Sequence, residues 1–118
     1  MASGINRLNT LVPMKMIRAI IRPEKEDKVR LALEQGAFIG LTKLTVSGRG
    51  KQGGIQVGSA RYDELPKIML LLVIEDGDTD RAVTTIQQAA FTGNFGDGVI
   101  FVSEVEAAYT IRTGAPVL

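Results

Sequence analysis

The spacing of hydrophobic and polar residues predicts a small set of strands. Residues 16–22 and 41–47 alternate between the two classes, as strands with one buried face do. Residues 67–75 are hydrophobic on both faces, so this strand needs cover on both sides. Residues 99–102 form a fourth strand, and residues 107–113 are expected to form a short fifth strand at an edge.

Two other segments follow helical spacing. The first opens with Pro23 and three acidic residues, which suit the positive end of a helix, and Gly36 supplies its stop. Its hydrophobic positions are Val29, Ala32 and Leu33. The second ends just before Gly93, and its hydrophobic positions are Val83, Ile86, Ala89 and Ala90.

The resulting order is β-α-β-β-α-β with a terminal strand, an α+β fold of the ferredoxin-like kind. We expect residues 1–13 to be a flexible extension and residues 14–118 to be one domain. A four-stranded sheet of this type carries its helices on one face only. The second face of the 67–75 strand is therefore covered either by another copy of the chain, sheet against sheet, or by the long loop of residues 48–63.

Composition narrows the chemistry. The 118 residues carry a formal charge of +1, which argues against a binder held mainly by nucleic-acid phosphates. The chain has no cysteine and no histidine, so disulfides, thiolate catalysis, histidine bases and Cys- or His-ligated metals are excluded. The longest hydrophobic run, residues 68–74, is too short for a membrane-spanning helix, and we expect a soluble, cytoplasmic protein.

Glycine is concentrated in two turns. Residues 48–58 hold five glycines, with Arg49, Lys51 and Gln52 among them, and residues 93–98 hold three more. Backbone amides in such turns can form concave anion sites, so the pair favours a phosphate or carboxylate ligand. The alternative is two flexible turns. Gly-x-Gly-x-x-Gly occurs from position 48, but it leaves a strand without opening a helix and so fails the dinucleotide-binding context.

Several separate motifs, in order, resemble the P-II nitrogen-regulatory proteins, and most closely their nitrogenase-associated branch. The resemblance covers about residues 14–114. The motifs are Met-Ile-Arg-Ala-Ile-Ile-Arg-Pro at 16–23, Gly-Arg-Gly-Lys-Gln-Gly-Gly at 48–54, Asp-Glu-Leu-Pro-Lys at 63–67, Thr-Gly-Asn-Phe-Gly-Asp-Gly-Val-Ile-Phe-Val at 92–102 and Ile-Arg-Thr-Gly at 111–114.

The resemblance implies a homotrimer, or a hetero-oligomer with a paralogous subunit, that binds ATP or ADP between subunits. It also implies 2-oxoglutarate and Mg-ATP at the base of a T-loop, here about residues 48–63, which docks on a target enzyme or transporter. The implied nucleotide-binding residues are Thr42 near the adenine, and Gly48, Gly50, Lys51, Gln52, Gly96, Asp97, Gly98 and Arg112 around the phosphates. The implied 2-oxoglutarate residues are Gln52, Gly54 and Lys67, with Gln52 also on the magnesium ion.

The chain departs from the family pattern at four places. Val99 stands where the family usually has a phosphate-binding lysine, Thr110 where many members have a second arginine, and Leu71 where an acidic residue is frequent. Fewer cations around a triphosphate predict weakened or altered nucleotide binding. The loop is short, and Tyr62 is interpreted as a hinge or packing residue rather than a modification site.

The leading interpretation is a non-enzymatic regulator of nitrogenase or another nitrogen-assimilation protein, responding to nitrogen, carbon and energy status. A P-II-like subunit with altered nucleotide binding, regulating a transporter or completing a hetero-oligomer, is the alternative. A small nucleotide-using enzyme would have to rely on Glu64, Lys67 and Asp97, which show no nucleophile–base spacing. An RNA-binding module of this fold would need stacking aromatics that the chain lacks.

Overall fold

A computed structural model describes residues 12–49, 55–57, 60–62 and 65–117. Its main sheet is antiparallel with strand order β2-β5-β1-β6. The strands are β1 (Met14–Ile21), β2 (Thr42–Gly48), β5 (Leu65–Glu75) and β6 (Gly98–Val105). The helices are α2 (Glu26–Gln35) and α3 (Thr79–Ala90), entered through the short 3-10 turns η1 (Pro23–Lys25) and η2 (Asp76–Asp78). The predicted βαββαβ order is confirmed.

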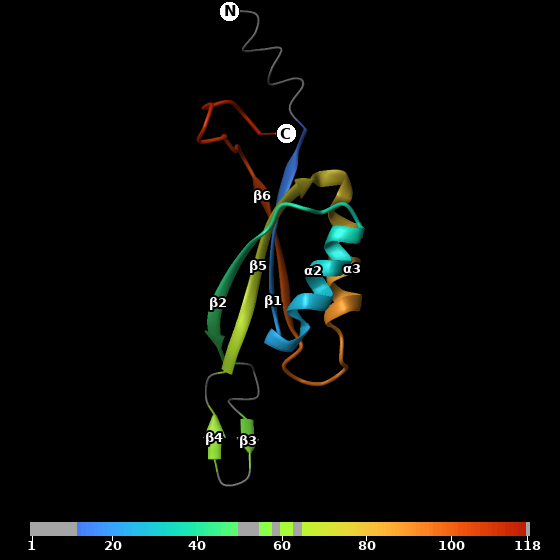
Figure 1. Ribbon diagram of the computed structural model, residues 1–118, viewed down its shortest axis with the longest axis vertical. Coiled ribbons are helices and arrows are strands. Elements are labelled where there is room, and N and C mark those ends of the chain that lie inside the picture. Colours follow the sequence, from blue (N-terminus) through green and yellow to red (C-terminus); the bar gives the residue numbers. More distant parts are fainter. Residues whose placement is uncertain (1–11, 50–54, 58–59, 63–64, 118) are drawn as a thin grey trace, which may run out of the picture.

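Both helices cover the same face of the sheet (Figure 1). Ile17, Ala19 and Ile21 lie on that face of β1, as the alternation predicted, and each is at most 2% exposed. The helix-facing side of β5 and the inner sides of the helices complete the core, with Ile68, Leu70, Leu72, Ile74, Val29, Leu33, Ala82 and Ile86 all buried. No helix in the described part of the chain is long and apolar enough to cross a membrane.

The opposite face of the sheet is open in the single chain. The strand register places Leu44, Met69, Ile20 and Val99 in one row across it, and the next row holds Thr42, Leu71, Arg18 and Phe101. Leu44, Val99 and Phe101 are 43%, 45% and 50% exposed. The prediction that β5 is hydrophobic on both faces is therefore confirmed, and the second face lacks a cover from the described residues.

Helix α2 ends as predicted at Gly36, but the left-handed residue is its neighbour. Gly36 has φ −83°, while Ala37 has φ +68°. The amide of Phe38 donates to the carbonyl of Leu33 at 2.8 Å, and that of Ala37 donates to the carbonyl of Glu34 at 3.0 Å. This arrangement satisfies the last helical carbonyls with an alanine where glycine is the usual residue.

Two parts of the chain differ from the sequence expectation. The 48–63 segment contains a short antiparallel pair, β3 (Ile55–Val57) and β4 (Ala60–Tyr62), where only a loop was expected. The strand expected over residues 107–113 is wrong: Tyr109 pairs only with Pro116 in an isolated bridge, and residues 111–113 form a turn. The amide of Gly114 closes that turn on the carbonyl of Thr110 at 2.7 Å. Most of the predicted extension, residues 1–11, lies outside the described residues.

Candidate functional site

The glycine-rich turn of residues 92–98 is folded around the carboxylate of Asp97. Its Oδ2 accepts the amides of Thr92 at 2.8 Å and Gly93 at 2.9 Å, and its Oδ1 accepts the Thr92 hydroxyl. The amide of Asn94 in turn donates to that hydroxyl oxygen at 3.2 Å. These bonds, first the Thr92 hydroxyl and then the Thr92 amide, hold the pKa of Asp97 well below its usual range. An ionised Asp97 therefore organises the turn from inside.

Two cations tie this turn to the sheet. Arg22, just after β1, donates from Nε to Asp97 Oδ1 at 3.0 Å and from a terminal nitrogen to the carbonyl of Phe95 at 2.7 Å. Lys67, on β5, donates from Nζ to the carbonyl of Gly96 at 2.5 Å. Burial of the ammonium, and then the nearby Arg22 charge, lower the pKa of Lys67.

Glycine is required at two positions in this turn, for different reasons. At Gly98 φ is +112°, and a Cβ would lie 1.8 Å from the carbonyl oxygen of Ile20, so the start of β6 packs backbone on backbone. At Gly96 φ is +95°, and a Cβ would lie 3.3 Å from the guanidinium of Arg22. The amides of Gly96 and Asp97 donate to no group in the described residues, whereas those of Thr92, Gly93 and Asn94 do. The amides of Gly96 and Asp97 are therefore available to bind an anion.

The other residues singled out in the sequence lie in three places. Thr42 is exposed on the open sheet face and pairs with Leu71, four residues along β5 from Lys67 and about 13 Å away. Gly48 ends β2, and among the described residues a Cβ there would meet the Lys67 Cγ alone, at an ordinary 3.7 Å, so none of these neighbours requires a glycine. Gly50, Lys51, Gln52 and Gly54 lie outside the described residues.

Arg112 is a predicted site residue that the chain holds far from the turn. The 92–98 turn precedes β6, and Arg112 follows it in the C-terminal turn at the other end of the sheet (Figure 1). The eight residues of β6 span about 25 Å. Arg112 is exposed and cannot reach an anion at the turn of its own chain.

The arrangement suits an anion held mainly by backbone amides. Arg22 is ion-paired to Asp97, whereas Lys67 contacts the turn at the Gly96 carbonyl and, among the described residues, has no carboxylate partner within ion-pair distance. Val99 lies on the open face next to this cluster and adds no charge. No cluster of acidic side chains in the described residues could hold a metal ion, which leaves the magnesium expectation resting on Gln52.

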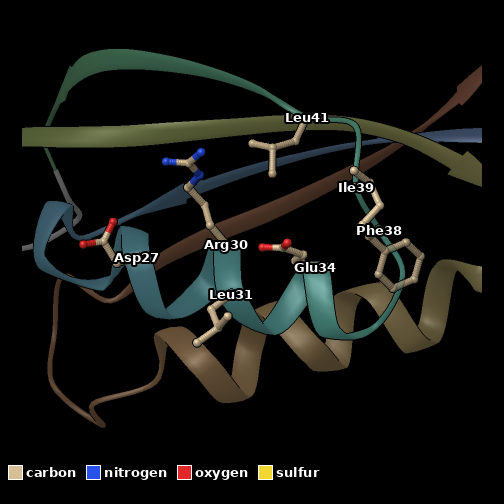
Figure 2. Close-up of a pocket in the computed structure, with 7 residues that line it drawn as sticks. All are labelled: Asp27, Arg30, Leu31, Glu34, Phe38, Ile39 and Leu41. Atoms are coloured by element: carbon tan, nitrogen blue, oxygen red, sulfur yellow. The ribbon is translucent and has the colours of Figure 1, made fainter.

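A separate cavity of about 400 Å³ lies between α2 and the connection to β2 (Figure 2). None of the predicted site residues that the structure describes lines it; its walls are Asp27, Arg30, Leu31, Glu34, Phe38, Ile39 and Leu41. The cavity is unfavourable for a phosphate because its lining holds two carboxylates, Asp27 and Glu34, and only one guanidinium, Arg30. This cavity therefore does not correspond to the anion site that the glycine motifs suggest.

Sequence reasoning assigned no role to Arg22 or Thr92, although both belong to the quoted motifs. The available signals were a cation at the end of a buried strand, just before Pro23, and a hydroxyl residue five positions ahead of an aspartate in a glycine-rich turn. Such signals are weak in sequence because they depend on two distant segments meeting.

Comparison with known proteins gives consistent matches. Residues 14–115 match the sequence profile of Nitrogen regulatory protein P-II. The chain is 59% identical over 103 residues to the Nitrogen fixation nifHD1 region GlnB-like protein 1 of Methanosarcina barkeri, covering 87% of this chain and 98% of that protein. It is 55% identical over 100 residues to the nifHD region GlnB-like protein 1 of Methanothermobacter marburgensis, covering 85% and 95%. It is 45% identical over 108 residues to the Nitrogen regulatory protein P-II 2 of Methanothermobacter thermautotrophicus, covering 88% and 94%.

Proposed function

The chain belongs to the Nitrogen regulatory protein P-II family, whose members form trimers and regulate partner proteins, and from this premise we propose that it is a nitrogen-status signalling protein. It binds ATP or ADP and 2-oxoglutarate between subunits and reports their levels to a target through the 48–63 segment. Relatives named for the nifHD region favour nitrogenase as the target, with another nitrogen-assimilation protein as the second choice.

The observation that carries the proposal is the separation of the 92–98 turn from Arg112. Both fit phosphate chemistry, one through free amides and the other through its guanidinium, yet β6 keeps them about 25 Å apart in one chain. A trimer whose subunits pack through the open sheet face can bring the turn of one subunit to Arg112 of the next. The nucleotide site is then complete only in the assembly.

The open face of the sheet also offers a surface along which the nucleotide can lie. The distance of about 13 Å along β5 from Lys67 to the Thr42–Leu71 pair matches phosphates at the 92–98 turn with the adenine near Thr42. We assign the far carboxylate of 2-oxoglutarate to Lys67, and the rest of that site to Gln52, Gly54 and the nucleotide-bound magnesium. Gly48, Gly50 and Lys51 complete the phosphate contacts. A bound magnesium ion would neutralise phosphate charge and orient the oxo acid.

The charge at this site bears on which nucleotide it prefers. With Val99 and Thr110 in place of cations, triphosphate gains fewer charge-assisted contacts, each worth about 1.5–3 kcal/mol. The alternative function follows from this: a P-II subunit with weak nucleotide binding that regulates through a hetero-oligomer or a transporter. Replacing Val99 by lysine restores the family charge and is expected to strengthen ATP binding about tenfold.

The test is titration calorimetry of the full-length protein with ATP, ADP and AMP, with and without magnesium and 2-oxoglutarate. We expect saturable ATP or ADP binding, and 2-oxoglutarate binding that requires Mg-ATP. Lys67→Gln should abolish the 2-oxoglutarate response, while Arg30→Gln, an arginine in an ion pair on α2, serves as the matched control. Absence of ATP and ADP binding at millimolar concentration would refute the nucleotide proposal, and the alternative would then be pursued by isolating partners with and without 2-oxoglutarate.

A further inference from the structure

We infer that Arg22 is a positioning residue for the 92–98 turn: it fixes the anion-binding amides in place through its contacts with Asp97 and Phe95. The inference deepens the proposed function and rests on it for the identity of the ligand. Its structural part, the control of the turn by Arg22, stands independently.

The geometry of Arg22 carries the argument. Its Nε meets the Asp97 carboxylate at 3.0 Å and its terminal nitrogen meets the Phe95 carbonyl at 2.7 Å. The two contacts fall on either side of Gly96, whose own position lies directly against the same guanidinium. A planar fork that grips two points two residues apart sets the orientation of the peptide units between them.

The environment strengthens the effect. The Arg22 and Asp97 side chains are only 21% and 25% exposed, so solvent screens their ion pair less than it screens a surface pair. Lys67 holds the Gly96 carbonyl from β5 on the adjacent side. The Gly96 carbonyl and the two neighbouring residues, Phe95 and Asp97, are thus all held by side chains of the protein. The direction of the Gly96 amide is therefore set before a ligand binds.

If Arg22 positions the turn, the shape of its guanidinium must matter as well as its positive charge. Lysine at position 22 keeps the positive charge but cannot grip Asp97 and Phe95 together as a fork. If Arg22 positions the turn, Arg22→Lys recovers only part of what Arg22→Gln loses. If Arg22 merely adds positive charge, Arg22→Lys recovers all of it.

The experiment compares full-length wild type, Arg22→Lys, Arg22→Gln and the control Arg30→Gln, using two readouts that need no ligand. The first is hydrogen exchange of the Thr92 and Gly93 amides relative to core amides of α3, and the second is the titration of the Asp97 carboxyl by NMR. We expect about tenfold faster exchange of both amides in Arg22→Gln, an intermediate value in Arg22→Lys, and no change in the control. The pKa of Asp97 should rise in Arg22→Gln but stay below its usual range, because the Thr92 and Gly93 bonds remain.

The third readout is ADP affinity by calorimetry, expected to fall about tenfold in Arg22→Gln and less in Arg22→Lys. Unchanged exchange and an unchanged Asp97 titration in Arg22→Gln would overturn the inference. Full recovery of all readouts by Arg22→Lys would also overturn it, by reducing the role to charge. If wild type binds no nucleotide, the proposed function fails, while the two ligand-free readouts still decide the role of Arg22.

Discussion

Replacing Gly98 by alanine tests the junction between the 92–98 turn and β6. The new Cβ would lie 1.8 Å from the carbonyl oxygen of Ile20 and 2.9 Å from its carbon. Strands β1 and β6 must therefore separate by more than an ångström at this point. A side chain at φ +112° adds backbone strain of its own.

We expect Gly98→Ala to lower the free energy of unfolding by about 3 kcal/mol, since a strained φ costs about 1–3 kcal/mol and overpacking costs a similar amount. This is a large share of the 5–15 kcal/mol or so that stabilises a typical domain. The assay is urea unfolding followed by circular dichroism, at one fixed protomer concentration because oligomer stability depends on concentration.

Gly96→Ala is the matched control for this prediction. Gly96 also has positive φ, at +95°, but its nearest neighbour is the movable end of Arg22 at 3.3 Å. Its cost should be about 1–2 kcal/mol, less than that of Gly98→Ala. A Gly98→Ala protein within about 0.5 kcal/mol of wild type, or a larger loss in Gly96→Ala, would refute the backbone packing described here.

Two further predictions concern stability. Ala37→Gly should raise the unfolding free energy by about 0.5 kcal/mol, because relief of the strain at φ +68° outweighs the added freedom of glycine in the unfolded chain. Urea unfolding midpoints measure this change, and a lower stability of the variant would contradict the prediction. Asp97 has a pKa lowered by folding, so its stabilisation is present above its unfolded value of 3.8 and is lost as pH falls further. Acid titration of stability should therefore be flatter below pH ~4 in Asp97→Asn, and identical slopes would contradict a stabilising role for the hydrogen bonds to Asp97.

Local pattern was enough for the helices and the main strands. The alternation of Ile17, Ala19 and Ile21 and the helical spacing of Val29 and Leu33 correspond to residues that are fully buried or nearly so. These elements are predictable because each buries one face, so the spacing of hydrophobic residues along the sequence directly identifies the buried positions. The two-sided hydrophobicity of residues 67–75 also indicated the open face correctly.

The misses occur where pairing depends on very few residues. The β3–β4 pair has three residues on each strand; its signal was Ile55 and Val57 in alternation before Gly58-Ser59, a dipeptide typical of two-residue hairpins. Residues 107–113 have strand composition, but the structure pairs Tyr109 with Pro116 in a turn instead. Short segments have too little burial for composition to decide their structure.

The residue types of the candidate site were predictable from the sequence, but the side-chain contacts that hold it together were not. The glycines marked the 92–98 turn as an anion site, and the amides of Gly96 and Asp97, which have no partner in the described residues, fit that prediction. The inward carboxylate of Asp97 and the grip of Arg22 depend on segments 75 positions apart in the chain.

The central claim, that subunits share each nucleotide site, is tested most directly by mixing two defective proteins. Asp97→Ala removes the organiser of the 92–98 turn, and Arg112→Ala removes the distant guanidinium, so each homotrimer should bind ADP poorly. Co-refolding the two in equal amounts should restore tight binding at about a quarter of the sites, those pairing an intact turn with an intact Arg112 from the neighbouring subunit. Calorimetry that finds no tight sites in the mixed trimers, although Arg112→Ala and Asp97→Ala each weaken binding alone, would contradict a site shared between subunits.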